Sequence, residues 1–496
     1  MRMPDPDPKA LERRQDLIDG LRRIVPGEGV IVDHDALTVY DCDALSAYRQ
    51  RPLAAVLPEN TRQVAAILRL CRDLAIKVVP RGGGTSLSGG SLPVADGIIL
   101  AMGRFNRILK VDLENRVAQV QPGVTNLAIS KAVDAQGFYY APDPSSQIAC
   151  SIGGNVSENA GGVHCLKYGM TSNNVLGLEM VTIDGEILRF GGSGLDQSGL
   201  DMLGLMVGAE GLLGIVTEVT VRLLPKPETQ RAALIGFPSN RQAADAVAAI
   251  IAAGIIPAAM EMMDKPAIQV TEDFVHAGYP LQVEALLIVE LDGPAVEVDH
   301  LLARVAEIAK NCGSETLRVS ECETERLTFW AGRKAAFPAV GRISRDYMTM
   351  DGTIPRGQLP DVLDHIAELS RHHGLRVANV FHAGDGNLHP LIMFDASLPG
   401  QLEAAENFGA DILRKCVAVG GVLTGEHGVG IEKRDLMREQ FDDVDLDQQR
   451  RLKDVFDPQG LFNPGKVFPL LHRCVAGGYE IVTAGANYTF PDLPRF

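Results

Sequence analysis

The sequence predicts an α+β fold divided into more than one domain, and three observations support this. Its 496 residues are too many for one ordinary hydrophobic core. Helical and strand patterns are mixed along the N-terminal part of the chain. Two prolines then interrupt a β-rich segment at 223–230, and a second set of strands and helices follows. We therefore expect a domain boundary at that segment.

The expected elements begin with an amphipathic helix at 61–75, whose apolar side chains share one face. A buried strand at 76–80 follows and leads into a glycine-rich loop at 81–90. Further along, an Asp-Gly pair is typical of a tight β-turn. The other elements expected before the boundary are a strand at 116–124, a helix at 126–137 and a hairpin at 176–190.

Beyond the boundary the pattern suggests a ferredoxin-like sheet with helices on one side. The expected elements are a strand at 285–291, a helix reaching about residue 310, a strand at 347–354, a helix from about 358 and a hairpin at 376–394.

Composition and charge exclude several classes of protein. Apolar residues make up 46% and charged residues 22%, as in ordinary globular proteins. A net charge of −16 disfavours nucleic acid and anionic membranes as partners. The longest apolar run, 246–260, is interrupted by Gly254 and Pro257, and the N-terminus lacks the apolar stretch of a signal peptide. We expect a cytoplasmic protein with no direct membrane span.

The cysteines bear on how electrons could leave the protein. Eight are scattered along the chain without a Cys-x-x-Cys pair, so neither a disulfide framework nor an iron–sulfur cluster is indicated. If the protein performs redox chemistry, its electrons must leave through another molecule.

Three glycine-rich segments indicate a large ligand. The loop 81–90 has five glycines, which let backbone N–H groups approach a pyrophosphate, although a plain turn would explain this loop alone. No Gly-Lys-Ser/Thr follows, which excludes a Walker loop, and the surroundings fit a Rossmann fingerprint poorly. Segments 142–162 and 208–219 are similarly rich in small residues. Together they predict one phosphate-containing cofactor.

The segment His-Ala-Gly-Asp-Gly-Asn-Leu-His places two histidines around a turn. A two-residue Asp-Gly turn would pair His382 with His389 on one face, with their Cβ atoms about 5 Å apart. A solvated histidine pair is the alternative interpretation. Glu426 and His427 in a Gly-Glu-His-Gly loop favour a metal site, because two histidines and one glutamate are a common catalytic zinc set. Neighbours in an extended segment point apart, so we expect one of 426 and 427 to bind metal.

The three glycine-rich segments resemble the FAD-binding domain of the vanillyl-alcohol-oxidase family. Within it, four longer segments resemble the family of FAD-linked catalytic subunits of bacterial glycolate oxidase, and the similarity covers nearly the whole chain. These segments are YYAPDPSSQIACSIGGNVSENAGGVHCLKYG, FWAGRKAAFPAVGRIS, ANVFHAGDGNLHP and GEHGVG.

The resemblance implies a domain organisation and a set of cofactor residues. Residues 1–228 would form the FAD-binding domain, 229–420 the substrate or cap domain, and 421–496 a C-terminal segment returning to the first. FAD would be non-covalent, because the loop 81–90 has no histidine for attachment. The residues implied to bind FAD are Arg81, Gly82, Gly83, Gly84, Thr85, Ser86, Pro142, Ser146, Gly153, Gly154, Ser157, Asn159, Glu210, Gly211, Gly214, Ile215, Val216 and Asn463.

The resemblance further implies oxidation of a small 2-hydroxy acid, glycolate to glyoxylate and also D-lactate, by hydride transfer to flavin N5. A divalent metal, zinc by its ligand set, would be held by three ligands while a base takes the hydroxyl proton. An arginine fork would bind the substrate carboxylate. The implied ligands are His382, His389 and Glu426, the base is His427, and the arginine is Arg333, with Lys334 and Arg342 as alternatives.

Further implications concern specificity and partners. Related 2-hydroxyglutarate enzymes place a threonine and a lysine where this chain offers Phe337 and Thr349, which favours a small monocarboxylate. A second flavin-fold subunit and an iron–sulfur subunit would pass electrons onward and could bring the protein to the inner membrane. The alternatives are a self-sufficient D-lactate dehydrogenase and a flavin-binding scaffold subunit without catalysis.

Overall fold

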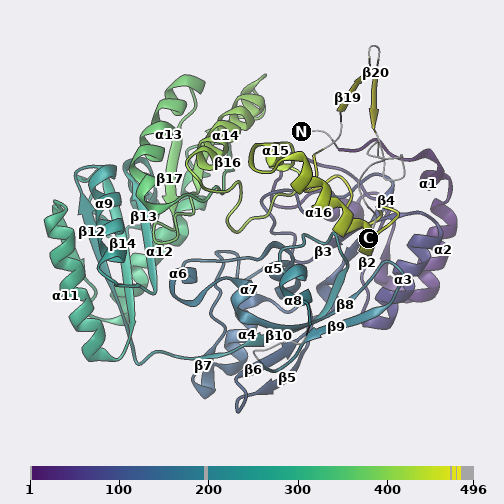
Figure 1. Ribbon diagram of the computed structural model, residues 1–496, viewed down its shortest axis with the longest axis horizontal. Coiled ribbons are helices and arrows are strands. Elements are labelled where there is room, and N and C mark those ends of the chain that lie inside the picture. Colours follow the sequence, from purple (N-terminus) through teal and green to yellow (C-terminus); the bar gives the residue numbers. More distant parts are fainter. Residues whose placement is uncertain (1–2, 195–198, 470–471, 476–477, 482–496) are drawn as a thin grey trace.

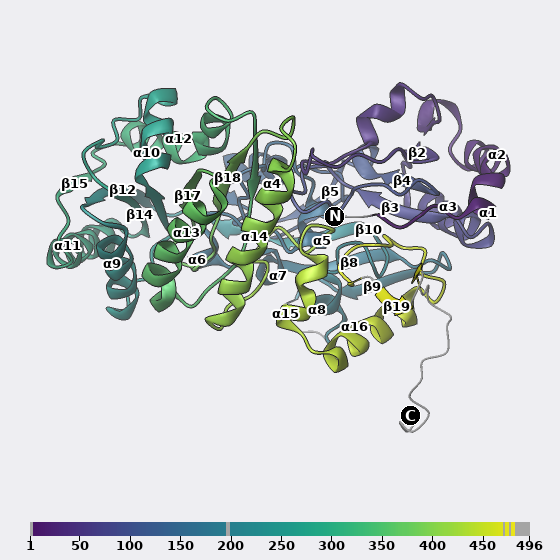
Figure 2. The ribbon, with the colours of Figure 1, turned by 90° about the horizontal axis from the view of Figure 1, so that it is seen from above.

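The computed structural model describes residues 3–194, 199–469, 472–475 and 478–481. Figures 1 and 2 show two parts side by side: the teal and green middle of the chain, and the purple and blue N-terminal half joined by the yellow C-terminal segment. Both parts contain helices and sheets, which confirms the α+β class. Among these residues, no helix combines the length and apolar character needed to cross a bilayer.

The first sheet is formed by β1 (Val30–Ile31), β2 (Ala54–Val56), β3 (Lys77–Arg81) and β4 (Gly97–Ala101), beside α1 (Pro8–Glu12), α2 (Arg14–Ile24) and α3 (Thr61–Asp73). Its order is β1-β2-β4-β3, and β4 is parallel to both β2 and β3. Leu17 of α2 and Leu68 of α3 are fully buried in the core of this sheet. Asn60 fixes the start of α3, because its side chain accepts the N–H of Gln63.

The second sheet is formed by β5 (Ile108–Asp112), β6 (Val117–Val120), β8 (Val175–Val181), β9 (Ile187–Gly191) and β10 (Ile215–Arg222). It is antiparallel, in the order β5-β6-β10-β8-β9. The predicted hairpin is the β8–β9 pair, and Gly185 in its turn has φ +75°, which glycine adopts without strain. The helices of this region are α4 (Asn126–Val133), α5 (Ile152–Glu158), α6 (Cys165–Tyr168), α7 (Thr171–Asn174) and α8 (Met202–Met206), and a short pair joins β7 (Phe138–Tyr139) to β11 (Leu224–Pro225).

The third sheet has seven strands: β12 (Thr229–Phe237), β13 (Ala259–Asp264), β14 (Ala285–Gly293), β15 (Thr316–Val319), β16 (Asp346–Thr349), β17 (Val377–Phe381) and β18 (Pro390–Phe394). It is antiparallel throughout, in the order β15-β12-β14-β13-β17-β18-β16. The helices that follow its strands are α9 (Asn240–Ala252), α10 (Lys265–Val275), α11 (Ala295–Asn311), α12 (Glu323–Val340), α13 (Leu359–His373) and α14 (Gln401–Ala418).

The expectation of helices on one side of this sheet is wrong. One face packs against α9, α11, α13 and α14, while α10 and α12 cover the other. The reason lies in the strands: in β12, Ala233 and Ile235 enter the first core, and Ala232 and Leu234 enter the second. A strand that is apolar on both faces must be buried on both.

The segment around α6 connects the first part to β14 of the third sheet. Nδ1 of His164 lies 2.8 Å from Asp143 Oδ2, and its Nε2 lies 3.2 Å from Glu290 Oε1. Lys167 donates to the carbonyl oxygen of Asp292 at 2.8 Å. Burial opposes a charge on His164, but Asp143 and Glu290 outweigh it and raise the pKa of the imidazole to about 10. The two parts are therefore joined by ionic contacts.

The C-terminal segment comes back to the first sheet. After α15 (Met437–Gln440) and α16 (Asp443–Phe456), Phe462 forms a parallel bridge with Val78 of β3. The N–H of Val78 donates to Leu461 at 2.8 Å, and that of Asn463 donates to Val78 at 2.8 Å. The division of the chain at 228 and 420 stays a prediction, and residues 470–471, 476–477 and 482–496 of its last segment lie outside the described residues.

Candidate functional site

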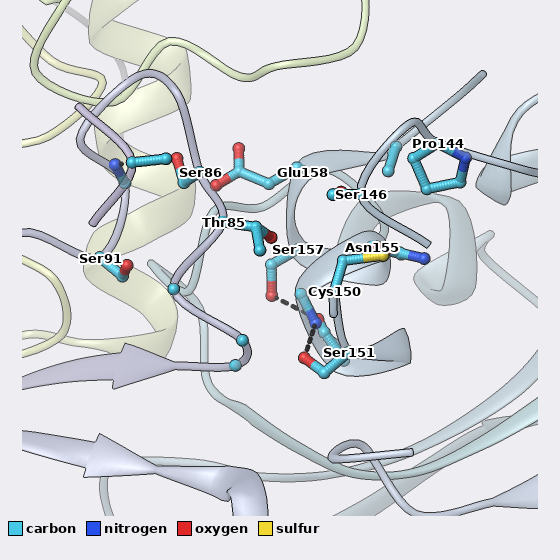
Figure 3. Close-up of a pocket in the computed structure, with 18 of the residues that line it drawn as sticks. Thr85, Ser86, Ser91, Pro144, Ser146, Cys150, Ser151, Asn155, Ser157 and Glu158 are labelled. Atoms are coloured by element: carbon cyan, nitrogen blue, oxygen red, sulfur yellow. Dashed lines mark hydrogen bonds between the residues drawn. The ribbon is translucent and has the colours of Figure 1, made fainter. Parts of the chain in front are cut away.

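A cavity of about 520 Å³ lies where the two parts of the molecule meet (Figure 3). The glycine-rich loop after β3, residues between 144 and 161, and the turn at 210–216 form most of its wall. On the other side α12 contributes Lys334 and Phe337. The cavity is therefore bounded by all three glycine-rich segments that the sequence singled out.

Glycines allow these walls to approach each other closely. A Cβ on Gly83 would lie 2.6 Å from the carbonyl oxygen of Ala149, and one on Gly153 would lie 2.6 Å from Cβ of Pro122. Gly211 has φ +70°, which other residues adopt only with strain. Backbone groups that close around a long cavity fit an extended, phosphate-containing cofactor such as FAD.

Most of the predicted cofactor residues line this cavity, and three do not. Asn463 is buried behind the wall, where its side-chain amide donates to Gly90 at 2.9 Å and to Glu210 at 2.7 Å. Pro142 offers its carbonyl to the side chain of Asn126, and Asn159 accepts an N–H from α7. These three residues support the wall. The predicted residues that do line it are Arg81, Gly82, Gly83, Gly84, Thr85, Ser86, Ser146, Gly153, Gly154, Ser157, Glu210, Gly211, Gly214, Ile215 and Val216.

Some lining residues were not predicted. The hydroxyl of Ser151 accepts the N–H of Gly154 at 3.2 Å and begins α5 (Figure 3), so its N-cap position could have been found from the sequence. Glu158 lies beside Ser86 at one end of the cavity (Figure 3), where burial and the nearby Glu210 raise its pKa. Nothing in the sequence signals that contact. Other unpredicted lining residues include Leu87, Ser91, Pro144, Ser145 and Asn155.

The histidine hairpin forms with a different register from the one predicted. His382 is bridged to Asn387, and residues 383–386 form a four-residue turn in place of the two-residue Asp-Gly turn. The N–H of Gly386 donates to the carbonyl of His382 at 3.0 Å, so the turn closes on His382 itself. His389 lies two residues beyond Asn387 and therefore on the same face as His382. The two histidines still meet, although they are not directly opposite.

His382, His389 and Glu426 come together at the edge of the cavity. The two imidazole rings are 5.0 Å apart, and the candidate ligand atoms of all three residues lie within 4.8 Å of one another. Oε1 of Glu426 is 3.1 Å from Nε2 of His382 and 3.4 Å from Nε2 of His389. This donor set is of the kind that binds catalytic zinc.

A second group that could hold an ion overlaps the first. Asp351, His389 and His427 also place one ligand atom each within 4.8 Å of the others. The Asp351 carboxylate, however, accepts several hydrogen bonds from residues 424–427, and the Lys433 ammonium lies 3.4 Å from it. Filled lone pairs and a neighbouring positive charge both work against a metal there. The group containing Glu426 is the better candidate.

His427 differs from the other two histidines. Its ring stacks on that of His389, with centroids 4.8 Å apart, and its buried Nδ1 has no hydrogen-bond partner among the described residues. Burial lowers the pKa of His427 to about 4, against the attraction of Asp351. His427 and Glu426 both line the cavity, although their sequence positions suggested opposite directions. A neutral imidazole with a free nitrogen can accept a proton.

Two carboxylates surround His382 and favour positive charge at this position. Nδ1 of His382 lies 2.6 Å from Glu261 Oε1 and its Nε2 faces Glu426, so its pKa is raised even though burial works against the charge. Burial alone would raise the pKa of Glu426, but the imidazoles of His382, His389 and His427 lower it to about 2. Glu261 also accepts a hydrogen bond from Arg333 Nε at 2.7 Å.

Of the three cationic residues predicted to bind the substrate carboxylate, only one lines the cavity. Arg333 does not line the cavity: it is 2% exposed and bound to Glu261. Lys334 and Phe337 do line it. Arg342 is exposed and lies over the ring of Phe274, 5.3 Å from its centroid. Thr349 is buried and does not line the cavity.

Comparisons with known proteins agree with this geometry. Residues 52–191 match the family model described as FAD binding domain, and residues 226–467 match FAD linked oxidases, C-terminal domain. The chain is 54% identical to glycolate oxidase subunit GlcD of Escherichia coli K12, covering 97% of both chains. It is 39% identical to the same subunit of Bacillus subtilis, over 87% of this chain and 92% of that one.

The chain is also similar to a second kind of enzyme and to a solved structure. A D-lactate dehydrogenase of Anaerostipes hadrus is 30% identical over 93% of this chain and 97% of its own. The solved structure of 4-ethylphenol oxidase from Gulosibacter chungangensis shares the fold with a TM-score of 0.80 at 20% identity, covering 94% of this chain and 99% of that one. From its two matched domains and its full-length similarity to GlcD, the chain belongs to the FAD-linked oxidase family.

Proposed function

We propose that this chain is an FAD-dependent dehydrogenase that oxidises glycolate to glyoxylate and accepts D-lactate as a second substrate. The observation that carries the proposal is that the cofactor cavity and the candidate metal site adjoin each other. The cavity walled by glycines ends at His389, Glu426 and His427, so cofactor and candidate metal ligands share one space. A substrate held there would present its Cα to the cofactor and its hydroxyl to the base.

The site residues divide the chemistry between them. When bound, FAD supplies the acceptor N5 for the hydride leaving Cα. When bound, a divalent ion on His382, His389 and Glu426 supplies the Lewis acidity that makes the hydroxyl easier to deprotonate. His427 takes the hydroxyl proton, since its lowered pKa keeps it neutral at physiological pH. Two electrons and one proton thus leave the substrate as hydride, and the second proton stays on the imidazole.

Arg333 is our candidate for the substrate carboxylate. Its Nε is occupied by Glu261, which also contacts His382, so the guanidinium is connected to a proposed metal ligand through one carboxylate. A guanidinium has five N–H donors, and Glu261 uses only one of them through Nε. Lys334, which lines the cavity, is the competing candidate. Phe337 narrows the same wall and favours a substrate without a second carboxylate.

Partners and location follow from the relatives and the cysteines. The relatives named GlcD are described as subunits, which supports an assembly that passes electrons onward. No candidate metal cluster among the described residues contains a cysteine, in keeping with an iron–sulfur centre carried by a separate subunit. We propose a second flavin-fold subunit and an iron–sulfur subunit as partners, and a cytoplasmic protein that reaches the inner membrane through them.

A self-sufficient D-lactate dehydrogenase is the second candidate, because a relative with that name covers 93% of this chain. A scaffold subunit without catalysis is disfavoured by the intact set of His382, His389, Glu426 and His427.

Anaerobic reduction of the bound flavin tests the proposal. Glycolate should bleach the flavin absorbance fastest, D-lactate more slowly, and D-2-hydroxyglutarate least, because neither Phe337, which lines the cavity, nor the buried Thr349 is a cation for a second carboxylate. A chelator should stop the bleaching while leaving the flavin spectrum of the resting protein unchanged. Faster reduction by D-lactate would support the second candidate, and no reduction by any of the three would support the scaffold.

A further inference from the structure

Asp351 lies at the centre of the candidate site but has no role in the chemistry proposed above. It follows β16 in the segment 350–354, which runs between the histidine hairpin and the loop 424–428. Thr353 in that segment is bridged to Asn387 on one side and to Val422 on the other. The segment therefore joins the two pieces of chain that carry the candidate metal ligands.

The Asp351 carboxylate accepts hydrogen bonds from successive N–H groups of the loop 424–428. Oδ2 accepts hydrogen bonds from the N–H of Gly425 at 3.0 Å, of Glu426 at 3.2 Å and of His427 at 2.8 Å. It also accepts the hydroxyl of Thr424 at 2.6 Å. Three successive N–H groups around one anion form a nest, a backbone shape that binds anions.

Lys433 completes the arrangement from the other side. Its ammonium donates to the carbonyl of Gly428 at 2.9 Å and lies 3.4 Å from Asp351 Oδ2. Both side chains are fully buried, so each charge depends on the other. The Lys433 ammonium and the loop N–H groups thus contact the same carboxylate oxygen.

We propose that Asp351 is a positioning residue that fixes the backbone of residues 424–427, and thereby sets the affinity of the site for a divalent cation without binding the ion. This inference rests on the metal site proposed above. Without the carboxylate, the N–H groups of Glu426 and His427 would lose their acceptor, while that of Gly425 would keep the backbone carbonyl of Asp351 at 2.8 Å. The loop would then turn to satisfy the two freed N–H groups elsewhere. The carboxylate of Glu426 would then leave the two histidines.

Direct coordination by Asp351 is the competing interpretation, because its oxygen also lies within 4.8 Å of ligand atoms on His389 and His427. The two interpretations differ in what each substitution removes. If Asp351 acts through the loop, Asp351→Asn weakens the site and Glu426→Gln abolishes it. If Asp351 is a ligand in place of Glu426, the order is reversed.

The experiment compares the FAD-containing full-length protein with Asp351→Asn, Glu426→Gln and Asp457→Asn. Asp457 is the matched control: it is equally buried and accepts two loop N–H groups, from Leu461 at 2.9 Å and Phe462 at 2.7 Å, outside the candidate metal site. Zn²⁺ affinity is measured by competition with a chromophoric chelator. Asp351→Asn should bind Zn²⁺ roughly 10–100-fold more weakly, as is typical when a partner of a metal ligand is lost. Asp457→Asn should match the wild type.

A second measurement does not depend on metal. Amide hydrogen exchange of Glu426 and His427 in chelator-treated protein should be faster in Asp351→Asn and unchanged in Asp457→Asn. Unchanged exchange there, or wild-type Zn²⁺ affinity, would overturn the inference. Should the wild type bind no Zn²⁺, the metal assignment fails while the exchange result still decides whether Asp351 holds the loop. If Asp351→Asn does not fold, Thr424→Val removes one of the same contacts, and smaller changes in the same direction are expected.

Discussion

Glu426 and His427 are adjacent in sequence, yet their surroundings make them suited to different tasks. Glu426 faces the Nε2 atoms of two imidazoles, and its pKa is lowered to about 2, so it remains a carboxylate able to bind a cation. His427 stacks on His389, its Nδ1 has no hydrogen-bond partner in the described part of the chain, and its lowered pKa keeps it neutral. At the scale of single residues, the proposed metal ligand and the proposed base are thus separated by one peptide unit.

Replacing the base and replacing a ligand should give different results. His427→Asn retains a hydrogen-bonding group of similar size but removes the proton acceptor, so FAD and metal content should persist. Flavin reduction by glycolate should slow by roughly 10²–10⁴-fold, the range of general-base catalysis. His382→Asn should lose metal together with activity. Stopped-flow flavin reduction and metal analysis of both variants test these roles. Metal loss in His427→Asn with metal retention in His382→Asn would indicate that His427 is the ligand and His382 the base.

The assignment of the substrate carboxylate can be tested on two neighbouring residues of α12. Arg333→Lys keeps the charge but loses the planar fork, so KM for glycolate should rise roughly 10–100-fold, as expected for a lost charged hydrogen bond. Lys334→Gln should change KM by less than about threefold. Metal content of Arg333→Lys must be measured as well, because Arg333 contacts Glu261 and through it His382. A large rise in KM in Lys334→Gln alone would indicate that Lys334, and not Arg333, binds the substrate carboxylate.

At the scale of elements, the local signals of the sequence predicted more than the contacts between elements. The helix α3, the strand β3 and the β8–β9 hairpin follow from apolar periodicity and turn residues, and all are present. The length of the turn after β17 could not be predicted, because a two-residue and a four-residue turn both place His382 and His389 on one face. Helices on both sides of the third sheet depend on which strands become neighbours, and that is set by packing between distant segments.

The same distinction holds for the cavity. Glycine-rich segments are visible in the sequence, and most of the predicted residues within them line the cavity. Asp351 and Glu261 are isolated acidic residues in the sequence, and their burial beside the site arises only after the chain has folded. Motif residues were therefore predictable, while the residues that orient them were not.

The glycine-rich loop gives a prediction at this scale. Gly83→Ala would place a methyl group 2.6 Å from the backbone oxygen of Ala149, which has no side-chain freedom with which to yield. The loop and α5 should separate, and the purified protein should carry less FAD per chain. Gly103→Ala is the control, because a Cβ there would meet no atom of the surrounding chain within 4 Å. Flavin-to-protein absorbance ratios report both, and an equal FAD content in the two variants would argue against a closely fitted loop.

At the scale of the whole molecule, the two parts meet through charges as well as through the cofactor cavity. His164 bridges Asp143, next to the cavity wall, and Glu290, in the middle of the third sheet. Glu290 in turn receives Arg326 Nη1 of α12 at 2.7 Å. The relative placement of the FAD-binding part and the helix that carries Arg333 therefore depends on the charge of one imidazole.

Stability should consequently depend on pH through His164. Its pKa of about 10 in the folded protein lies above the value of about 6.5 expected when unfolded. A raised pKa gives a stabilisation that is complete below pH 6.5 and is lost as pH rises toward 10. The difference in thermal midpoint between wild type and His164→Gln should be largest near pH 6 and shrink steadily above it. His34→Gln, at a side chain that is 76% exposed, is the control, and a constant difference for His164→Gln would contradict the prediction.

The return of the C-terminal segment to β3 has a consequence for biosynthesis. Asn463 connects Gly90 to Glu210, and Phe462 lies beside Val78, so the wall of the FAD cavity is completed by residues translated long after the glycine-rich segments. At about 5–20 residues per second, the ribosome needs on the order of tens of seconds to go from β10 to Asn463. During that interval the nascent N-terminal half has its glycine loops but not the segment that closes them. We therefore expect FAD to be captured tightly only after Asn463 has left the ribosome.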